Sequence, residues 1–317
     1  MDDFTALAAP LRPEILAHCY RMLGSAGDAE DATQETYLRA WRGFGRFAGR
    51  SSLRVWLHRI ATNACLRAIE QRGRRALPSG LGAPERDWRH PLRADTRTLW
   101  LEPLPTPADT AFAKASIRLA FVAALQHLPA RQRAVLLLRD VVGLPAGEVA
   151  EALEMSTVAV NSALLRARDR LARAAPVADD LAEPSAVRPL VDRYVRAFED
   201  ADVGALREVL REDVTLEMPP FPAWFAGRAA VTGFLGAWVL DPPSRFRSWG
   251  GTPEANGCPT VVTYLRRPDA TLHAHAIQVL EVTPSGIRHV HVFLSPELFG
   301  TFGLKPVTTE GGADLYR

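Results

Sequence analysis

The sequence predicts a multidomain protein with two all-α domains followed by an α+β domain. Apolar residues recur at three- and four-residue spacing over residues 10–75 and again over residues 111–174, and that spacing is the period of an amphipathic helix. Residues 76–110 contain six prolines and separate the two helical stretches. Later in the chain apolar and polar residues alternate, as they do in strands. Helices followed by such strands indicate a separate α+β domain.

Charge is distributed unevenly along the 317 residues, a length that suits two or three domains. The net charge is only +2. Residues 1–75 carry 12 arginines against 8 acids, and residues 111–175 carry 9 basic against 5 acidic side chains. Residues 176–317 carry 13 basic against 18 acidic side chains. Two basic blocks joined to an acidic one place any contact with a polyanion in the first half of the chain.

The cysteines and the hydropathy pattern predict a cytoplasmic protein. Cys19, Cys65 and Cys258 are too few and too scattered for a disulfide framework, which fits a reducing compartment. The N-terminus is acidic and lacks a long apolar run, which argues against a secretory signal. No stretch approaches the roughly 20 apolar residues of a membrane helix, so no membrane contact is expected.

Residues 1–75 are expected to form the first helical domain. The stretch "GSAGD" at 24–28 and the stretch "GRFAGRSS" at 45–52 break it into successive helices. Ser51 or Ser52 is the expected N-cap of the helix that follows, because a serine oxygen can accept a hydrogen bond from a free backbone N–H in the first turn.

The helix between these breaks contains "DAEDATQETYLRAW" at residues 28–41. Its first acids lie in a first turn, where the helix dipole favours them. That explanation does not extend to Gln34 and Glu35, which lie a turn or more further along. The helical period places one polar strip on a single side of this helix. The strip contains Asp28, Asp31, Gln34, Glu35, Leu38 and Arg42. We expect this side to face another protein.

Residues 76–110 are expected to be an extended, partly mobile linker because of their prolines. Residues 111–175 are expected to form the second helical domain, with a helix-turn-helix in "PAGEVAEALEMSTVAVNSALLRARDRL" at 145–171. Ser156 is the expected N-cap of its second helix. The side chains that could face DNA are Ser156, Thr157, Val158, Asn161, Ser162, Leu165, Arg166 and Arg168. The alternative is an ordinary helical hairpin with a solvated arginine face.

The buried side of that second helix is expected to carry Val160, Leu164, Ala167 and Leu171, which lie at i, i+4, i+7 and i+11. Small, polar and basic residues on the opposite side suit entry into the major groove. Glu154 stands in the turn, where many such motifs use glycine for a positive φ.

The last third contains several histidines on two expected strands. If the "TPSG" turn sets Thr283 opposite Ile287, then His289 faces Glu281, as general acid–base chemistry requires. A two-residue turn would shift the register and remove that pairing. A metal site is not expected, because His275 lies roughly 10–13 Å from the partner of His291 in either register. The alternative to catalysis is that the histidines, including His273, simply line a polar or pocket face.

Three motifs in this order, "DAEDATQETYLRAW", "FAGRSSLRVWLHRIATNACLRAI" and "LPARQRAVLLLRDVVGLPAGEVAEALEMSTVAVNSALLRARDRL", resemble the extracytoplasmic-function (ECF) sigma factors of the sigma-70 superfamily. The resemblance covers residues 10–173. It implies that the partners are core RNA polymerase, through its β′ clamp helices and β flap, and promoter DNA. It also implies that the helix from Asp28 to Trp41 docks on the clamp helices, where Asp31, Gln34, Glu35 and Arg42 match the usual contact positions.

The same resemblance assigns residues 45–67 to the promoter −10 element, and strand opening needs cations and aromatic or shaped surfaces for single-stranded bases. The candidates are Arg46, Phe47, Arg50, Arg54, Arg59 and Asn63. Trp56 and Leu57 are expected to be core residues instead. The helix-turn-helix would read the −35 element, but Asn161 and Ala163 depart from the frequent lysine and arginine, so no base preference is implied. The linker would thread toward the RNA exit path.

Residues 186–304 follow a second linker at 176–185 and precede a tail at 305–317. The stretches "LVDRYVRAFEDADVGALREVLREDVTLEMPP" and "WFAGRAAVTGFL" resemble a SnoaL-like domain, an α+β cone around a pocket. Sigma factors with such extensions include the actinobacterial sigma-G group. Regulation in cis is expected, because this part of the chain is acidic, follows the basic DNA-reading segment through a short linker and shows no separate chemistry. A small ligand in the pocket is possible, and no cofactor and no enzymatic activity are expected. An anti-sigma partner is not identified.

Two other function classes stay open from the sequence. One is an enzyme of the isomerase or cyclase type, or a ligand sensor, fused to a DNA-binding module. His289 and Glu281 are then the weak catalytic candidates. The other is a DNA-binding repressor without polymerase contact.

Overall fold

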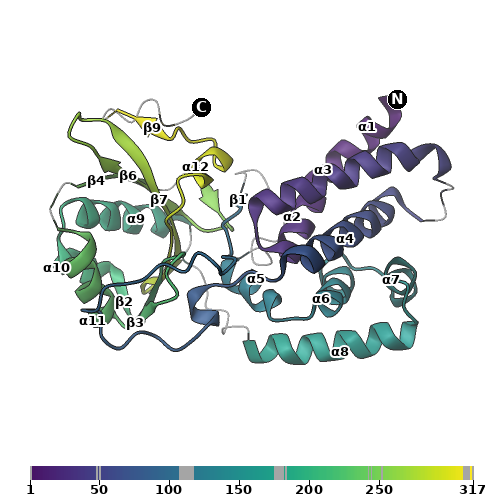
Figure 1. The fold of residues 1–317 in the computed structure, drawn as a ribbon, viewed down its shortest axis with the longest axis horizontal. Helices are drawn as coiled ribbons and strands as arrows, with labels where there is room; N and C mark the ends of the chain where they lie inside the picture. Colours follow the sequence, from purple (N-terminus) through teal and green to yellow (C-terminus); the bar gives the residue numbers. More distant parts are fainter. Residues whose placement is uncertain are drawn as a thin grey trace. The chain divides into compact units, whose positions relative to one another are not determined.

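The structure is a computed structural model that describes residues 2–47, 49, 51–106, 118–174, 182, 184–241, 243, 245–250, 253–309 and 315. The chain forms two compact units (Figure 1). Residues 1–75 and 111–176 form the helical unit, and residues 76–110 and 177–317 form the α+β unit. Each unit is described by itself below.

The first half of the helical unit contains α1 (Asp2–Ala8), α2 (Arg12–Leu23), α3 (Ala26–Gly43) and α4 (Leu53–Arg72), with short 3₁₀ turns at Ala9–Leu11 and Phe44–Arg46. Gly24, at φ +71°, ends α2. The backbone N–H of Asp28 donates to the Ser25 hydroxyl at 3.2 Å, and that of Val55 donates to the Ser52 hydroxyl at 3.2 Å. The expected breaks and the expected serine cap are therefore confirmed, with Ser52 as the capping residue.

These helices pack closely because small side chains line α3. Ala29, Ala32 and Ala40 are buried against α2 and α4. Leu57 is fully buried, as expected for a core residue. Trp56 is only partly buried and stacks on Phe47, with ring centroids 4.8 Å apart.

The second half contains α5 (Leu119–Gln126), α6 (Ala130–Leu136), a π-helical turn (Leu137–Val141), α7 (Ala146–Leu153) and α8 (Thr157–Ala174). Val160, Leu164 and Ala167 are buried and Leu171 is partly buried, so the expected apolar side of the second motif helix is confirmed. Glu154 ends α7 at φ +54° and ψ +50°. A left-handed residue therefore does form the turn, although its side chain is not glycine.

The two helical halves pack into one unit instead of standing as separate domains. The buried guanidinium of Arg133 on α6 donates to the carbonyl of Met22 on α2, and to the Gln126 side-chain oxygen at 2.6 Å. Burial lowers the pKa of Arg133 to about 10. A buried cation needs several acceptors, and here carbonyls from both halves supply them. The sequence reasoning missed this contact because helical periodicity does not reveal which helix ends meet.

The α+β unit contains one seven-stranded sheet, a two-stranded ribbon and helices (Figure 1). The helices are α9 (Pro184–Glu199), α10 (Val203–Val209), α11 (Arg228–Phe234, continued by a π turn at Leu235–Val239) and α12 (Leu298–Thr301). The main-sheet strands are β2 (Leu210–Glu217), β3 (Trp224–Ala226), β4 (Phe246–Gly250), β6 (Thr260–Arg266), β7 (Leu272–Thr283), β8 (Gly286–Phe293) and β9 (Val307–Thr308).

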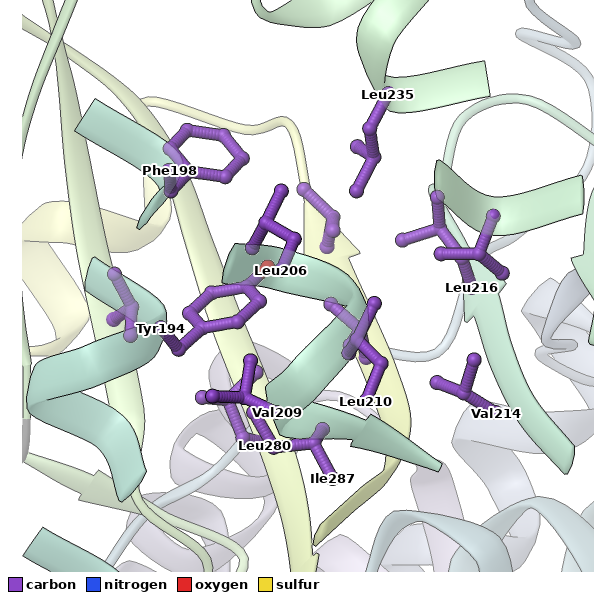
Figure 2. Packing of buried hydrophobic residues seen from close by; sticks show 14 of the residues in the cluster. Tyr194, Phe198, Leu206, Val209, Leu210, Val214, Leu216, Leu235, Leu280 and Ile287 are labelled. Atoms are coloured by element: carbon purple, nitrogen blue, oxygen red, sulfur yellow. The ribbon is translucent and has the colours of Figure 1, made fainter. Parts of the chain in front are cut away.

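The strand order is β3-β2-β8-β7-β6-β4, with β9 paired to β7. Among the described strands of this sheet, β2 and β8 pair in parallel and the other pairs are antiparallel. Figure 2 shows the core that α9 and α10 make with one face of the sheet, where Tyr194, Phe198 and Leu206 lie against Leu280 and neighbouring strand residues. We call this the inner face. The expected α+β class is confirmed.

The hairpin between β7 and β8 resolves the question of register. Thr283 pairs with Gly286, so the turn has two residues. A bulge then holds Arg288 as an extra residue and restores the pair Glu281–His289. The expectation that a two-residue turn removes this pairing was therefore wrong, because a bulge adds the missing residue.

Residues 76–106 are not an extended linker but fold onto the α+β unit; we call this segment the strap. Backbone–backbone hydrogen bonds join it to the rest of the α+β unit at three places. The N–H of Glu85 donates to the carbonyl of Trp224 at 2.7 Å, and that of Asp95 donates to the carbonyl of Pro220 at 2.8 Å. The third place is strand β1 (Pro105–Thr106), which pairs with β5 (Glu254–Ala255).

The strap is held in place by burial as well as by backbone bonds. Its side chains Leu77, Leu101 and Leu104 are buried. The prolines suggested an extended chain, but these leucines and the free edge of β3 provide partners that composition does not reveal. Residues 107–110 of the expected linker lie outside the described residues.

Candidate functional sites

The polar strip on α3 is largely exposed. Asp31, Gln34, Leu38 and Arg42 are exposed, and Glu35 is partly exposed and paired with Arg39 on the next turn. Two large apolar side chains lie on the same helix surface, since Leu38 and Trp41 are each 50% exposed. Exposed aromatic and aliphatic side chains among charges are typical of a protein-binding surface.

Asp28 differs from the rest of the strip. Its side chain is only 14% exposed, and its carboxylate accepts from Arg75 at 2.7 Å and from Arg72. These ion pairs tie the start of α3 to the end of α4. The structure therefore gives Asp28 a role inside the unit, and its contact with a partner stays a prediction.

The −10 candidates do not form one open surface. Arg46 is exposed, whereas Phe47 and Asn63 are partly buried. Arg50 lies outside the described residues. The other two arginines bridge the two helical halves.

Arg54 donates to Glu14 at 2.8 and 3.0 Å and to the carbonyl of Val142 at 3.2 Å. Arg59 pairs with Glu151 of α7 at 3.3 Å. Arg54 and Arg59 are thus both engaged with other parts of the helical unit. DNA contact would require them to change partners.

The outward side of α8 is open. Val158 and Leu165 are 74% and 71% exposed, and Thr157, Asn161 and Arg166 are exposed beside them. Ser156 caps the helix by accepting from the N–H of Ala159 at 3.2 Å. Two of the expected DNA-contacting residues are less accessible or already paired. Ser162 is partly buried, and Arg168 forms an ion pair with Asp140 at 2.7 Å.

The inner face of the sheet encloses a cavity of about 350 Å³ beneath α9 and α11. Its walls are mainly apolar, and Pro91 and Leu92 of the strap complete them. The polar lining side chains are Tyr194, Arg245, Thr263, His275 and Gln278. His275 therefore lines the cavity, as the sequence analysis considered for these histidines.

The other face of the sheet carries a buried cluster that sequence reasoning missed in part. The His291 Nδ1 lies 2.8 Å from Glu217 Oε1, and both side chains are buried. The N–H of Ser79 in the strap donates to Glu217 Oε2 at 3.0 Å. Glu217 was not among the candidates; an acid inside the otherwise apolar run "VTLEMP" was the available signal.

The electrostatics of this cluster follow from burial and pairing. Burial by itself lowers the pKa of His291, but the hydrogen bond and charge of Glu217, with Glu281, raise it overall. Burial raises the pKa of Glu217, but His291 and the Ser79 N–H lower it overall. Burial lowers the pKa of His289, whose Nδ1 lies 2.5 Å from the Thr215 hydroxyl.

The pair His289–Glu281 exists, but its position does not suit chemistry in the cone. The two side chains project from the sheet face opposite the cavity, because neighbouring residues such as Leu280 and Val290 point inward. The distance from His289 Nε2 to Glu281 Oε2 is 3.6 Å, longer than a hydrogen bond. The pairing of His289 with Glu281, one of two alternatives that the sequence left open, is thus present, but the pair does not face the cavity.

His273 lies near the start of β7, where its Nε2 is 3.0 Å from the Thr271 hydroxyl. Within the described ranges no group of three or more histidine, cysteine or acidic side chains is arranged to hold a metal ion. No described helix is long and apolar enough to cross a membrane.

We predict that Glu217→Gln destabilises the α+β unit more at pH 6 than at pH 9. The raised pKa of His291 contributes stability below its ordinary value near 6.5, and this is lost as pH rises through the raised value. The lowered pKa of Glu217 contributes stability above its ordinary 4.5, and this is lost as pH falls. The pair therefore stabilises most between about pH 4.5 and 6.5.

Urea unfolding followed by tryptophan fluorescence measures this, because Trp88, Trp100, Trp224, Trp238 and Trp249 all lie in the α+β unit. The expected loss at pH 6 is about 1.5–3 kcal/mol, the range for a hydrogen bond to a charged group. The exposed Glu208→Gln is the control. Equal losses at the two pH values would contradict the assignment.

Comparison with known families matches two segments of this chain. Residues 7–75 match the family described as Sigma-70 region 2, and residues 118–171 match Sigma-70, region 4. Both segments lie in the helical unit. The first contains the α3 strip and the second contains the helix-turn-helix.

Comparison with whole proteins extends the similarity into the α+β unit. The ECF RNA polymerase sigma factor SigG of Mycobacterium tuberculosis H37Rv is 47% identical over 313 residues, covering 95% of this chain and 84% of that protein. The probable ECF sigma factor SigI of the same species is 25% identical, covering 93% and 94%. The crystal structure of its SigJ shares the fold, with a TM-score of 0.63 at 21% identity over 96% of this chain and 99% of that one.

Proposed function

This chain belongs to the ECF sigma factors, which direct core RNA polymerase to promoters and initiate transcription, and we propose how its parts divide that work. Region 2, in residues 7–75, binds core polymerase and handles the −10 element. Region 4, in residues 118–171, reads the −35 element. The α+β unit regulates both in cis, in the cytoplasm, by holding the strap that joins them. The exposed strip on α3 is the observation that carries this proposal.

The α3 surface is suited to the clamp helices of the β′ subunit. Leu38 and Trp41 would lose their water on docking, and burial of apolar surface drives association. Asp31, Glu35 and Arg42 surround them and supply charges that set the orientation and choice of partner. Tryptophan and arginine side chains, such as Trp41 and Arg42, often contribute most of the binding energy of an interface.

The α8 surface is suited to the major groove. Asn161 lies near the start of the helix, where recognition helices contact bases. Arg166 would contact phosphate, which contributes affinity without sequence preference. The exposed methyl groups of Val158 and Leu165 can meet thymine methyl groups.

The packed helical unit corresponds to a closed state in this proposal. Two elements centred about 25 base pairs apart lie about 85 Å apart along straight duplex, at 3.4 Å per base pair. A compact unit of roughly 140 residues has a radius of gyration of only about 14 Å. Both elements can be read at once only if the halves separate. Arg54 and Arg59 then leave Val142 and Glu151 and become free for DNA.

The strap connects this opening to the α+β unit. Its residues 76–106, fully extended, would span about 100 Å at roughly 3.3 Å per residue. Folded on the α+β unit, it cannot provide that length. Release of the strap therefore permits the halves to separate, and the α+β unit acts as a restraint on promoter binding.

We assign no turnover to the α+β unit. The pair His289–Glu281 points away from the cavity. Within the cavity, Tyr194 and Gln278 are hydrogen-bonded to each other. A transcription factor with a regulatory domain accounts for these positions better than an isomerase or cyclase.

We predict that Arg166→Ala weakens promoter binding without affecting core polymerase binding. Loss of one phosphate contact should lower the salt dependence of DNA binding by about one unit of slope. Run-off transcription from a promoter with both elements should fall about fivefold to tenfold, or roughly 1–1.4 kcal/mol. The exposed Arg193→Ala on α9 is the control. An unchanged salt slope would refute the assignment of α8 to DNA.

A further inference from the structure

We infer that the cavity of the α+β unit is a binding site for a small, mostly hydrocarbon carboxylic acid. The hydrocarbon lies between the inner sheet face and α9 and α11, and the carboxylate lies at the mouth beside Arg245 and His275. Pro91 and Leu92 of the strap close over the ligand. Binding does not depend on the proposed cis regulation; only the effect of the ligand on transcription rests on that proposed function.

The size and lining of the cavity point to a ligand. Its volume of about 350 Å³ far exceeds the small voids that close packing leaves in a protein interior, and it falls in the range of small-molecule sites. Most of the wall is hydrocarbon or aromatic. The apolar lining includes Phe198, Leu216, Met218, Phe234, Leu235 and Val292.

The polar side chains on the floor of the cavity already have hydrogen-bond partners in the protein. The Tyr194 hydroxyl donates to Gln278 Oε1 at 2.7 Å, and Gln278 Nε2 donates to the Thr263 hydroxyl at 3.0 Å. The Ser248 hydroxyl lies 3.2 Å from the same Thr263 oxygen. Because these buried groups bond to one another, the deep part of the site accepts an apolar group without leaving them unpaired.

The mouth of the cavity, in contrast, carries a cation. The guanidinium of Arg245 lies 5.4 Å from the centroid of the Phe246 ring, and the His275 ring stacks on the same phenylalanine at 5.2 Å. Arg245 is exposed, and the described lining contains no Asp or Glu. An anion at the mouth would therefore meet a cation without a competing carboxylate.

His275 adds a neutral donor to this cation. Burial, with the charges of Arg245 and Arg267, lowers the pKa of His275 to about 4. At pH 7 its imidazole is neutral and can donate one N–H. A carboxylate can accept from His275 and Arg245 together, whereas an alcohol gains less and an amine is repelled by Arg245.

The strap is part of the wall and not a distant neighbour. Pro91 and Leu92 line the cavity, and Leu92 packs against the core. Just before them, the carbonyl of Trp88 accepts from the Trp238 indole N–H at 2.8 Å. A ligand in the cavity would add contacts to the strap and hold it on the α+β unit.

Isothermal titration calorimetry of the full chain tests the site with decanoate, decan-1-ol and decylamine below their aggregation concentrations. Decanoate should bind most tightly and decylamine most weakly. Arg245→Gln should weaken decanoate at least about tenfold and change decan-1-ol less than about threefold. Arg193→Gln, also exposed, is the matched control. Equal binding of decanoate and decan-1-ol, unaltered decanoate binding by Arg245→Gln, or no saturable binding would overturn the inference.

A cavity-filling variant, Ala276→Leu, should weaken decanoate and decan-1-ol alike, because Ala276 lines the cavity. If this variant does not fold, Arg245→Gln at the exposed mouth still decides the question. Hydrogen exchange at residues 85–95 should slow with decanoate, and unchanged exchange would remove the strap from the site. Decanoate that binds as expected but leaves transcription unchanged would count against the proposed cis regulation and not against the site.

Discussion

Asp31→Arg is expected to raise the Kd of the full chain for core RNA polymerase about 10- to 100-fold, or roughly 1.4–2.8 kcal/mol. Asp31 is exposed on α3 beside Leu38 and carries no ion pair among the described residues. Its replacement therefore changes the charge of the surface without unfolding the helix. Reversal of a charge at an interface both loses an attraction and introduces a repulsion.

The matched control for this experiment is Glu70→Arg. Glu70 is exposed near the end of α4, within the same half of the helical unit but off the α3 strip. Its reversal changes the net charge equally, so a general electrostatic effect would appear in both variants. The double variant Asp31→Arg, Glu35→Arg should not co-purify with core polymerase. If both proteins bind as tightly as the unaltered chain, the α3 assignment is wrong.

Gly233→Val is expected to detach the strap and to increase transcription several-fold from a promoter with both elements. A Cβ at Gly233 on α11 would lie 2.7–3.0 Å from three atoms of the Trp88 indole, closer than packed atoms approach. The indole must then move. Loss of about 1.5 kcal/mol of burial, the low end for a large side chain, shifts the strap equilibrium roughly tenfold toward release.

Hydrogen exchange at residues 82–95 measures the release, and run-off transcription measures its effect. Ala229→Val is the control, because Ala229 is exposed on the same helix. Trp88→Ala should reproduce the result by an independent change. Faster exchange with unchanged transcription would refute cis regulation. Reduced transcription would mean that the folded strap promotes transcription instead of restraining it.

These point variants are cleaner than deletion of the chain after residue 175. Deletion should also change promoter activity, but it removes the surface on which the strap folds. Leu77, Leu101 and Leu104 would then become exposed, and exposed apolar side chains promote association of the protein with itself. A change in promoter activity after deletion would therefore combine two effects, loss of the regulatory unit and self-association of the protein through the exposed strap.

The strap shows the limit of prediction from composition. Its prolines indicated an extended chain, and a chain without partners would be extended. Its actual partners are the carbonyls of Pro220 and Trp224 and the surface of α11, which lie more than 100 residues later. The local sequence of a segment does not show which distant residues it will contact.

The histidine cluster shows a different limit. Alternation along β7 and β8 left the pairing of His289 with Glu281 open, because it depended on the turn, and a bulge after a two-residue turn decided it. It did not reveal which sheet face encloses the cavity, because both faces are partly buried. Nor did it bring Glu217 to His291, since β2 and β8 pair in parallel from opposite ends of the domain.

The sequence by itself determined the helices, their serine caps, the exposed strip on α3 and the exposed surface of α8. These features depend on residues within a few turns of one another, so periodicity and capping chemistry suffice. Only the tertiary structure decided that Arg54, Arg59 and Asp28 are engaged inside the helical unit and that the strap closes a cavity. A side chain in a pattern shows what it can bind, but its neighbours in space determine what it does bind.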